Sequence, residues 1–311
     1  MNVCKKNNFK GENLQTFINS KKEYKNLIIL KKKVYLNAQL EKLYSVKSSS
    51  EFWLIINSYR KKSPVSDYIT LVEWQKYLLK MFPNDQIVVI NNSPYIEVQK
   101  LDTPISYDEI KMTIKNCKNN KSPGPDLVSY EFLKNLPDYA IICLKNILNK
   151  FLLEEKISED SAKIFLKMIH KKGDKNDPGN YRPIALANCI LKIYGLILNN
   201  RLNEFVEEKN ILPEFQSGFR KKRSTVDNIF TLSSIIQIRL KEKKSKMFAL
   251  FVDFKEAFPS INHQILWQKL SKLGVSTKFI NILKDIYNKA AVAVKNSMGA
   301  TDYIKLSKGL L

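Results

Sequence analysis

The run of apolar residues from Met247 to Val252, followed directly by Asp253, constrains the fold of this chain more than any other stretch. A half-exposed strand alternates polar and apolar residues, so an unbroken apolar run predicts a buried central strand. A carboxylate at the end of such a strand is costly unless the strand opens into a cleft. Two interpretations are open at this point. Asp253 binds a divalent cation such as Mg²⁺, which prefers carboxylate oxygens, or it is an exposed residue that closes the strand.

Composition indicates a globular chain with an anionic partner. The 311 residues are 44% hydrophobic, which is enough for a substantial core. Lys and Arg number 52 against 30 acidic residues, a net charge of +22, and this bias favours nucleic acid as the partner. A Lys-rich surface that reflects codon usage in an AT-rich genome is the alternative source of the charge.

Cysteine and histidine usage argues against two other classes of protein. The four cysteines are widely spaced and the chain has two histidines, so neither a zinc site nor a disulfide scaffold is expected. No apolar stretch approaches the roughly 20 residues that a membrane span needs. The N-terminus also lacks the apolar core of a signal peptide. We therefore expect an intracellular protein, in the nucleus or cytoplasm, without a membrane.

Residues 1–98 are Lys-rich with helical spacing, and we interpret them as a basic helical N-terminal extension. The apolar spacing predicts one long helix with an interruption near Val34, and a second helix from Asp67 to Phe82 before Pro83. Beyond the extension, Ser106 followed by Glu109 predicts a capping box at the start of another helix.

A rigid turn and a hairpin follow. Ser122-Pro-Gly-Pro-Asp126 comes directly after Lys121, and Asp126 is placed to begin or cap the next helix. Residues 164–169 and 181–186 then read as two strands joined by turn residues. Lys171 or Lys172 and Arg182 give this hairpin a basic rim that could converge on a triphosphate, since Arg offers bidentate contacts and Lys a point charge. A solvated hairpin is the alternative.

A second basic cluster runs from Arg220 to Arg223, directly ahead of a helix that we expect to begin at Ser224 or Thr225. A helix N-terminus beside such a cluster is suited to phosphate, and we favour Arg220 and Arg223 as nucleic-acid contacts. A solvated basic loop is the other interpretation. After Asp253, Asn262 predicts the start of a further helix, and residues 291–306 predict a closing hairpin.

Four blocks in one order resemble the reverse transcriptases of non-LTR, LINE-like retrotransposons, among them those of the Jockey type. They are Lys121-Ser-Pro-Gly-Pro-Asp126, Asn180-Tyr-Arg-Pro-Ile184, the run from Gln216 to Thr225, and Asp253 with Ala257-Phe258. The resemblance covers roughly residues 45–311. It implies an α+β fold, a partial right-hand polymerase in which residues 99–311 form the fingers and an incomplete palm.

The resemblance also implies roles for individual residues. Asp253 would be the catalytic carboxylate and would bind metal together with the backbone carbonyl of Phe254, while Phe258 would lie under the sugar of the incoming nucleotide. Lys171, Lys172 and Arg182 would hold the triphosphate. Lys121, Arg220 and Arg223 would contact nucleic acid.

The reaction that the resemblance implies is the copying of an RNA template from a DNA primer with deoxynucleoside triphosphates and Mg²⁺ or Mn²⁺. The Gln-Gly and Ala-Asp-Asp motifs of the family are not in this sequence. We therefore expect a segment truncated before these motifs, with weak or absent metal binding and no catalysis on its own. The alternative function is that of a catalytically dead remnant acting as a basic nucleic-acid-binding protein.

Overall fold

The computed structural model describes residues 12–46, 48, 51–53, 55–56, 68–83, 94–241 and 245–310. The chain forms two compact units, residues 1–66 and residues 67–311. The domain boundary that the sequence predicts between residues 98 and 99 stays a prediction. None of the described helices is long and apolar enough to cross a membrane.

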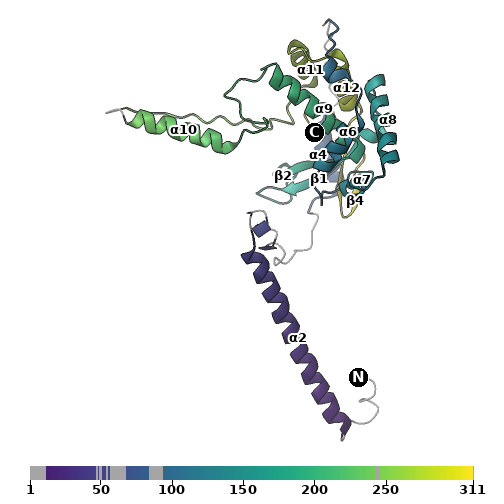
Figure 1. Ribbon diagram of the computed structural model, residues 1–311, viewed down its shortest axis with the longest axis vertical. Helices are drawn as coiled ribbons and strands as arrows, with labels where there is room; N and C mark the ends of the chain where they lie inside the picture. Colours follow the sequence, from purple (N-terminus) through teal and green to yellow (C-terminus); the bar gives the residue numbers. More distant parts are fainter. Residues whose placement is uncertain are drawn as a thin grey trace. The chain divides into compact units, whose positions relative to one another are not determined.

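The first unit is built on one long helix, α2 (Glu12–Tyr44) (Figure 1). The interruption expected near Val34 is wrong, because α2 contains neither proline nor glycine and therefore nothing that breaks its backbone hydrogen bonds. Most of its described apolar side chains, among them Leu27, Leu30 and Val34, are exposed.

The second unit contains a mixed sheet flanked by helices. The hairpin β1 (Lys163–His170) and β2 (Tyr181–Ala187) is antiparallel, as the sequence predicts. Strand β3 (Ala291–Asn296) pairs parallel to β1, and β4 (Gly299–Ala300) and β5 (Ile304–Lys305) pair antiparallel to β3. The expected closing hairpin is thus confirmed, and the unit has the mixed α and β structure that the sequence indicates.

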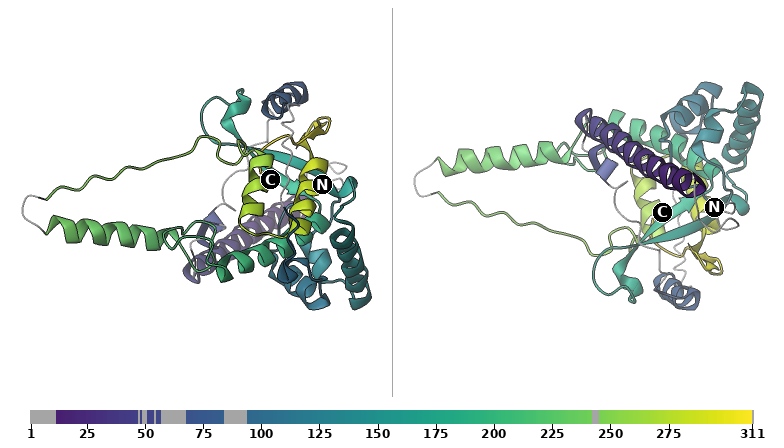
Figure 2. Two further views of the ribbon diagram at one scale, coloured as in Figure 1. Left: turned by 90° about the horizontal axis from the view of Figure 1, so that it is seen from above. Right: turned by 90° about the horizontal axis from the view of Figure 1, so that it is seen from below.

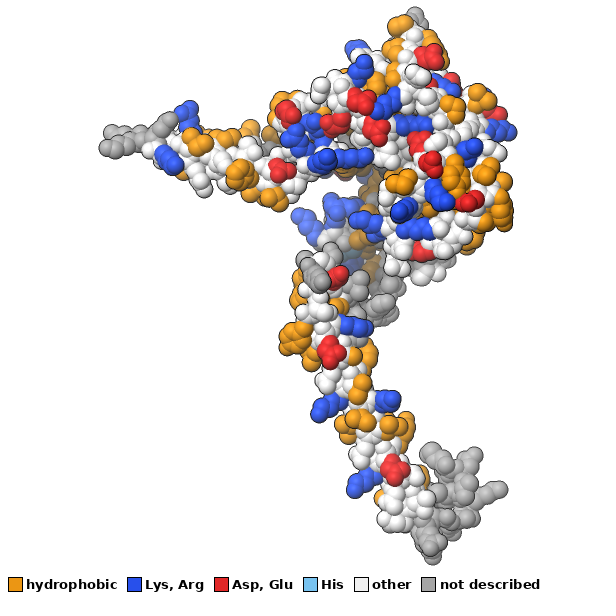
Figure 3. Space-filling view, viewed as in Figure 1, with side chains coloured by type: hydrophobic (Ala, Val, Ile, Leu, Met, Phe, Trp, Pro, Cys, Tyr) orange, Lys and Arg blue, Asp and Glu red, His pale blue; other side chains and the backbone are white. Residues whose placement is uncertain are grey.

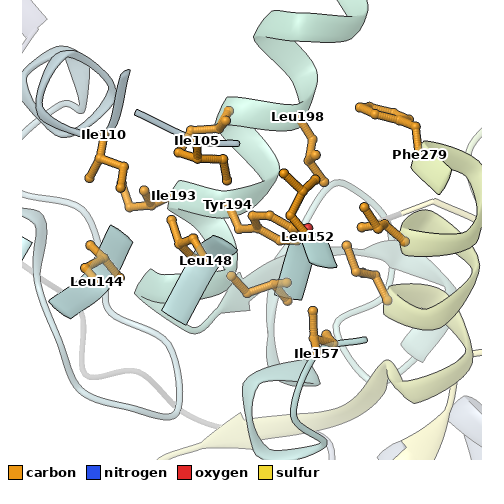
Figure 4. Packing of buried hydrophobic residues seen from close by; sticks show 14 of the residues in the cluster. Ile105, Ile110, Leu144, Leu148, Leu152, Ile157, Ile193, Tyr194, Leu198 and Phe279 are labelled. Atoms are coloured by element: carbon orange, nitrogen blue, oxygen red, sulfur yellow. The ribbon is translucent and has the colours of Figure 1, made fainter. Parts of the chain in front are cut away.

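Helices α5 to α12 make most of the remaining structure, together with the 3-10 turns η1 (Asp160–Ala162) and η2 (Pro178–Asn180). Their bounds are α5 (Gln99–Asp102), α6 (Tyr107–Asn116), α7 (Tyr130–Lys134), α8 (Asp138–Glu154), α9 (Cys189–Glu208), α10 (Thr225–Leu240), α11 (His263–Lys272) and α12 (Thr277–Lys289). The main core surrounds α9, whose Ile193, Tyr194 and Leu198 pack among side chains of α6, α8 and α12 (Figure 4).

A second core cluster lies on one face of the sheet. Helix α4 (Leu71–Met81) begins at Thr70, which forms a capping box with Glu73. Its Trp74 and Leu78 pack against the even-numbered side chains of β1, such as Ile164, and against β3. The amphipathic helix expected from 67 to 82 is therefore present, and it buries its apolar stripe on the sheet.

The start of α6 differs from the expected capping box. Ser106 Oγ accepts a hydrogen bond from Glu109 N at 3.0 Å, as predicted. The Glu109 carboxylate instead accepts two hydrogen bonds from the Arg201 guanidinium, at 2.8 and 2.7 Å. Arg201 lies on α9 and is buried, and it also donates to the carbonyls of Leu101 and Thr103. A charged partner outweighs a backbone N–H here, because a buried guanidinium must be paired.

The buried central strand predicted for Met247–Val252 is wrong. The segment is extended without strand pairing, and Phe248, Leu250 and Phe251 are 81 to 90% exposed. Both edges of β1 and of β3 are already paired, so the central positions among the described strands are taken. Helix α10 likewise buries no side chain; it and the segment after it extend away from the sheet, with hydrophobic side chains on the surface (Figures 2 and 3).

Candidate nucleic-acid interface

The turn that follows Asp253 is held against the residues at 309 and 310. Gly309 N donates to Ile261 O at 2.8 Å, and Leu310 N donates to Phe258 O at 3.1 Å. Gly309 has a φ of +85°, and a Cβ there would lie 3.0 Å from Pro259 Cα. Glycine is required at this position for both its conformation and its close approach.

His263 adds a third link between the same two segments. Its Nε2 lies 2.6 Å from Gly309 O, which assigns the ring N–H to that nitrogen. The imidazole packs against the rings of Tyr287 and Trp267, with centroid distances of 4.8 and 6.0 Å. Asn262 caps α11 directly before it, as the sequence predicts, so the ring is fixed at the first turn of a helix.

The loop that contains the Arg220–Arg223 cluster, here called the basic loop, lies beside this turn. The Phe219 ring meets the Phe258 ring edge-on at 6.1 Å, and both side chains are more than half exposed. Residues far apart in the sequence, 219, 258 and 309–310, are thus gathered at one place. Ser224 caps α10 through a capping box with Asp227, so the helix start expected behind the loop is confirmed.

The two predicted arginines of this loop form ion pairs in the structure. Arg220 donates to both Glu207 carboxylate oxygens, at 2.9 and 2.7 Å, and to Pro213 O at 3.0 Å. The hydrogen bond from Arg220 lowers the pKa of Glu207 below its usual value. Arg223 pairs with Glu214. The guanidiniums therefore order the loop, and their contact with nucleic acid stays a prediction.

Asp253, Phe254 and Phe258 all have exposed side chains. Among the described residues, no group of three or more His, Cys, Asp or Glu side chains is placed to hold a metal ion. Asp253 therefore lies on the surface, and Glu256 is a second exposed carboxylate in the turn that follows it.

The basic rim of the hairpin forms as expected. Lys171 N donates to Asn180 O at 2.8 Å, which closes the hairpin beyond the His170–Tyr181 pair. The side chains of Lys171, Lys172 and Arg182 are exposed around this end. Arg182 pairs in register with Ile169, so its side chain lies on the face of the sheet opposite α4. The structure thus brings the three predicted phosphate ligands to one end of β1 and β2.

Charges from the hairpin loop and from the turn after Asp253 both act on Tyr77 of helix α4. Burial raises the pKa of Tyr77 above its usual value, and the charges of Glu256 and Asp177 raise it further. Glu256 belongs to the turn after Asp253, and Asp177 to the hairpin loop. Both segments consequently lie within electrostatic range of one tyrosine on α4.

Asp126 does not begin or cap the helix that contains Tyr130, contrary to expectation. Ser129 caps α7, with its Oγ accepting from Phe132 N. The Asp126 carboxylate instead accepts from Val128 N at 3.2 Å and from Cys189 N, at the start of α9, at 2.6 Å. The positive end of a longer helix attracts the carboxylate more strongly than a five-residue helix does.

The rigid turn around Gly124 is docked where β2 joins α9. A Cβ on Gly124 would lie 2.2 Å from Ala187 O and 2.7 Å from Asn188 N, so only glycine allows this approach. Burial raises the pKa of the neighbouring Cys189 thiol to about 11. Lys121 is exposed at the start of the docked turn.

Sequence reasoning missed one group of side chains on the sheet. Phe165 and Tyr303 stack with a centroid distance of 6.1 Å and an interplanar angle of 18°. Lys295 Nζ lies 4.7 Å from the Phe165 centroid, and Lys163 Nζ lies 5.8 Å from that of Tyr303. The alternation of Lys163, Phe165 and Lys167 with apolar residues in β1 was the signal that could have found it.

Comparison with known proteins places the Arg220–Arg223 cluster, the turn after Asp253 and residues 309–310 within one matched stretch. Residues 169–310 match the family described as reverse transcriptase (RNA-dependent DNA polymerase). The chain is 34% identical over 197 residues, 62% of its length, to the probable RNA-directed DNA polymerase from transposon BS of Drosophila melanogaster. It is 28% identical over 185 residues, 59% of its length, to the RNA-directed DNA polymerase from mobile element jockey of Drosophila funebris.

The probable RNA-directed DNA polymerase from transposon X-element of Drosophila melanogaster is 29% identical over 194 residues, 62% of the chain. These matches cover 22, 20 and 21% of the BS, jockey and X-element proteins, respectively. The chain thus spans about a fifth of the length of the relatives it matches.

Proposed function

This chain carries a reverse transcriptase domain related to those of non-LTR retrotransposons, and we propose that it is a segment of a polymerase that copies RNA into DNA. The observation that carries the proposal is the gathering of Phe219, Phe258 and Gly309 around the turn after Asp253. All three lie within the matched residues 169–310. Nucleic acid, a template RNA with a DNA primer, would be bound by this segment.

In this proposal residues 99–311 form the fingers and part of the palm of a right-hand polymerase. The sheet and its flanking helices would supply the fingers. The turn after Asp253, with residues 309 and 310 held against it, would belong to the palm.

The proposed nucleotide site combines two parts of the second unit. Lys171, Lys172 and Arg182 would hold the triphosphate, since they extend from one end of a rigid hairpin. Phe258 would support the sugar, because its backbone carbonyl is fixed by Leu310 N and its ring contacts Phe219. Lys121, Arg220 and Arg223 would contact the nucleic-acid backbone.

The residues present do not by themselves fit a catalytic metal site. Reverse transcriptases use divalent metal ions, and Mg²⁺ requires near-octahedral oxygen coordination. Asp253 would supply one carboxylate and the Phe254 backbone carbonyl one further oxygen. Among the described residues no group of three or more His, Cys, Asp or Glu side chains surrounds them. We therefore derive no metal-dependent step from this chain alone.

The first test addresses nucleic-acid binding. With a net charge of +22, the chain is expected to bind a structured RNA without metal, with log K falling linearly against log salt. Replacing Arg220 and Arg223 together by Gln should reduce that slope by roughly 1.4 to 1.8, because each phosphate contact contributes roughly 0.7 to 0.9. Fluorescence anisotropy at several salt concentrations measures both.

A slope that stays unchanged in the double variant would instead assign both guanidiniums to the ion pairs with Glu207 and Glu214. Lys150→Gln is a suitable control, because this exposed lysine on α8 pairs with Glu154 and has no proposed contact with RNA. Its slope should equal that of the unmodified chain, because no phosphate contact is removed.

The second test addresses the nucleotide site. In a polymerase that joins this chain to the remaining polymerase portion of a jockey-type relative, Phe258→Ala should allow extension with ribonucleotides. Removal of the ring would open space for a 2′-OH under the sugar. Primer-extension gels with dNTPs or rNTPs compare the two substrates. Phe215→Ala is the control, because this phenylalanine is 86% exposed and lies outside the turn after Asp253. Unchanged rejection of rNTPs in Phe258→Ala would remove this residue from the site.

A second candidate function is nucleic-acid binding without catalysis. The absence of a group of three or more His, Cys, Asp or Glu side chains around Asp253 among the described residues favours it. In that case the joined polymerase would bind primer and template with the same salt dependence and would not extend the primer.

A further inference from the structure

One face of the sheet in the second unit is not part of either hydrophobic core. Helix α4 covers the face that carries Ile164 and Leu166. The opposite face, here called the open face, carries the side chains of every other residue of each strand. They are Lys163, Phe165, Lys167, Ile169, Arg182, Ile184, Leu186, Ala291, Ala293, Lys295, Tyr303 and Lys305.

The open face is strongly cationic. Five of its side chains carry positive charge, at positions 163, 167, 182, 295 and 305. Of these, Lys163 forms an ion pair with Asp160 at 2.7 Å. The side chains of the other four are exposed. A surface of this kind attracts a polyanion.

The stacked rings of Phe165 and Tyr303 lie among these charged side chains. Phe165 is on β1 and Tyr303 directly precedes β5, and β3 runs between them. The residue of β3 in register with Phe165 is Ala293, whose small side chain allows the two rings to meet across the strand. Tyr303 is 40% exposed, so the sheet presents π surface to solvent.

We propose that the open face binds single-stranded RNA, with a base stacked on Phe165 and Tyr303 and the phosphates beside Lys295, Lys167 and Lys305. The lysines that now lie over the two rings occupy the places that bases would take, since both are attracted to a π face. A single strand fits better than a duplex, because paired bases stack on one another and offer the sheet only phosphates.

This proposal rests on the proposed function, and it deepens that function by giving the template strand a position. Arg182 lies on the same face, in register with Ile169. A strand bound across Phe165 would therefore approach the hairpin end at which the triphosphate site is proposed.

The test compares two ligands of equal charge with the full chain. One is a labelled oligouridine RNA of about ten nucleotides, and the other is an abasic strand with the same ribose-phosphate backbone. Tyr303→Leu and Phe165→Leu should weaken binding of the oligouridine about tenfold, the loss expected for one stacked base. Binding of the abasic strand should change less than about twofold. Tyr303→Phe, which keeps the ring, should bind like the unmodified chain.

Tyr139→Leu is the matched control, because this tyrosine is 73% exposed on α8 and lies outside the open face. Equal losses for both ligands, no loss for either, or the same loss in the Tyr139 control would overturn the proposal. Tighter binding of a duplex than of the oligouridine would also overturn it. Should Phe165→Leu fail to fold by circular dichroism, Tyr303→Leu carries the test, because Tyr303 lies at the edge of the sheet.

The same measurement separates this proposal from the proposed function. If the unmodified chain binds neither strand, both the proposed function and the stacking of a base on Phe165 and Tyr303 are wrong. If it binds both strands equally and Tyr303→Leu changes nothing, only the proposed stacking on the open face is wrong.

Discussion

At the scale of single residues, the guanidinium of Arg201 connects the start of the second unit to its central helix. It is almost fully buried, forms two hydrogen bonds with the Glu109 carboxylate and contacts three backbone carbonyls, those of residues 101, 103 and 104. A buried charge of this kind is tolerated because every donor direction is met by an acceptor.

Arg201→Ala is therefore expected to destabilise the chain by about 3 to 5 kcal/mol, because it leaves the partly buried Glu109 carboxylate without its partner. Lys111→Ala, which breaks an exposed ion pair with Asp138, should change the stability far less, because exposed ion pairs contribute little. Urea denaturation followed by circular dichroism gives both values. Equal effects of the two substitutions would mean that Arg201 does not hold α6 and α9 together.

The role of a polar side chain could be predicted from the sequence where its hydrogen-bond partner is a near neighbour in the chain. Ser106, Ser224 and Asn262 cap helices as their positions predict. Glu109 and Asp126 act over distance instead, on Arg201 and on the N-terminus of α9. Local pattern could not reveal these partners, because they lie more than 60 residues away in the chain.

At the scale of elements, the turn at residues 121–126 is a rigid connector docked against the junction of β2 and α9. Gly124→Ala should destabilise the chain by about 3 kcal/mol, because its Cβ would overlap backbone atoms of Ala187 and Asn188, which cannot rotate away. Thermal unfolding of the variant measures the change.

Gly195→Ala is the matched control for Gly124→Ala. Gly195 lies inside α9, and a Cβ there would meet nothing within 4 Å. This substitution should raise the stability by up to about 1 kcal/mol, because alanine favours a helix over glycine. If Gly124→Ala were as stable as this control, the docking of the turn would be incidental.

Local strand pairing could be predicted from the sequence, and pairing between distant segments could not. The β1–β2 hairpin was predictable, because its two strands alternate and are joined by turn residues. The parallel pairing of β1 with β3 was not, since it joins distant segments that carry no local signal. For the same reason the apolar run from Met247 to Val252 was assigned to a central strand position that β1 and β3 occupy.

At the scale of the whole molecule, the family and its sequence blocks were recognised from the sequence, and their spatial relation was not. The gathering of residues 219, 258 and 309–310 depends on the packing of α11, α12 and the sheet, which fixes segments that no motif connects. The open face of the sheet likewise emerged only when the register of β1 with β3 and of β3 with β5 was known.

The central proposal is that the turn after Asp253 forms part of the catalytic centre of an RNA-directed DNA polymerase. Its most direct test is primer extension on an RNA template with Mg²⁺, using this chain joined to the remaining polymerase portion of a jockey-type relative. The joined protein should extend the primer, and Asp253→Asn should abolish extension while leaving RNA affinity within about twofold, because one charge among many alters binding little. Glu256→Gln, which removes a charge from the same turn, should retain activity. Extension that survives Asp253→Asn would contradict the claim.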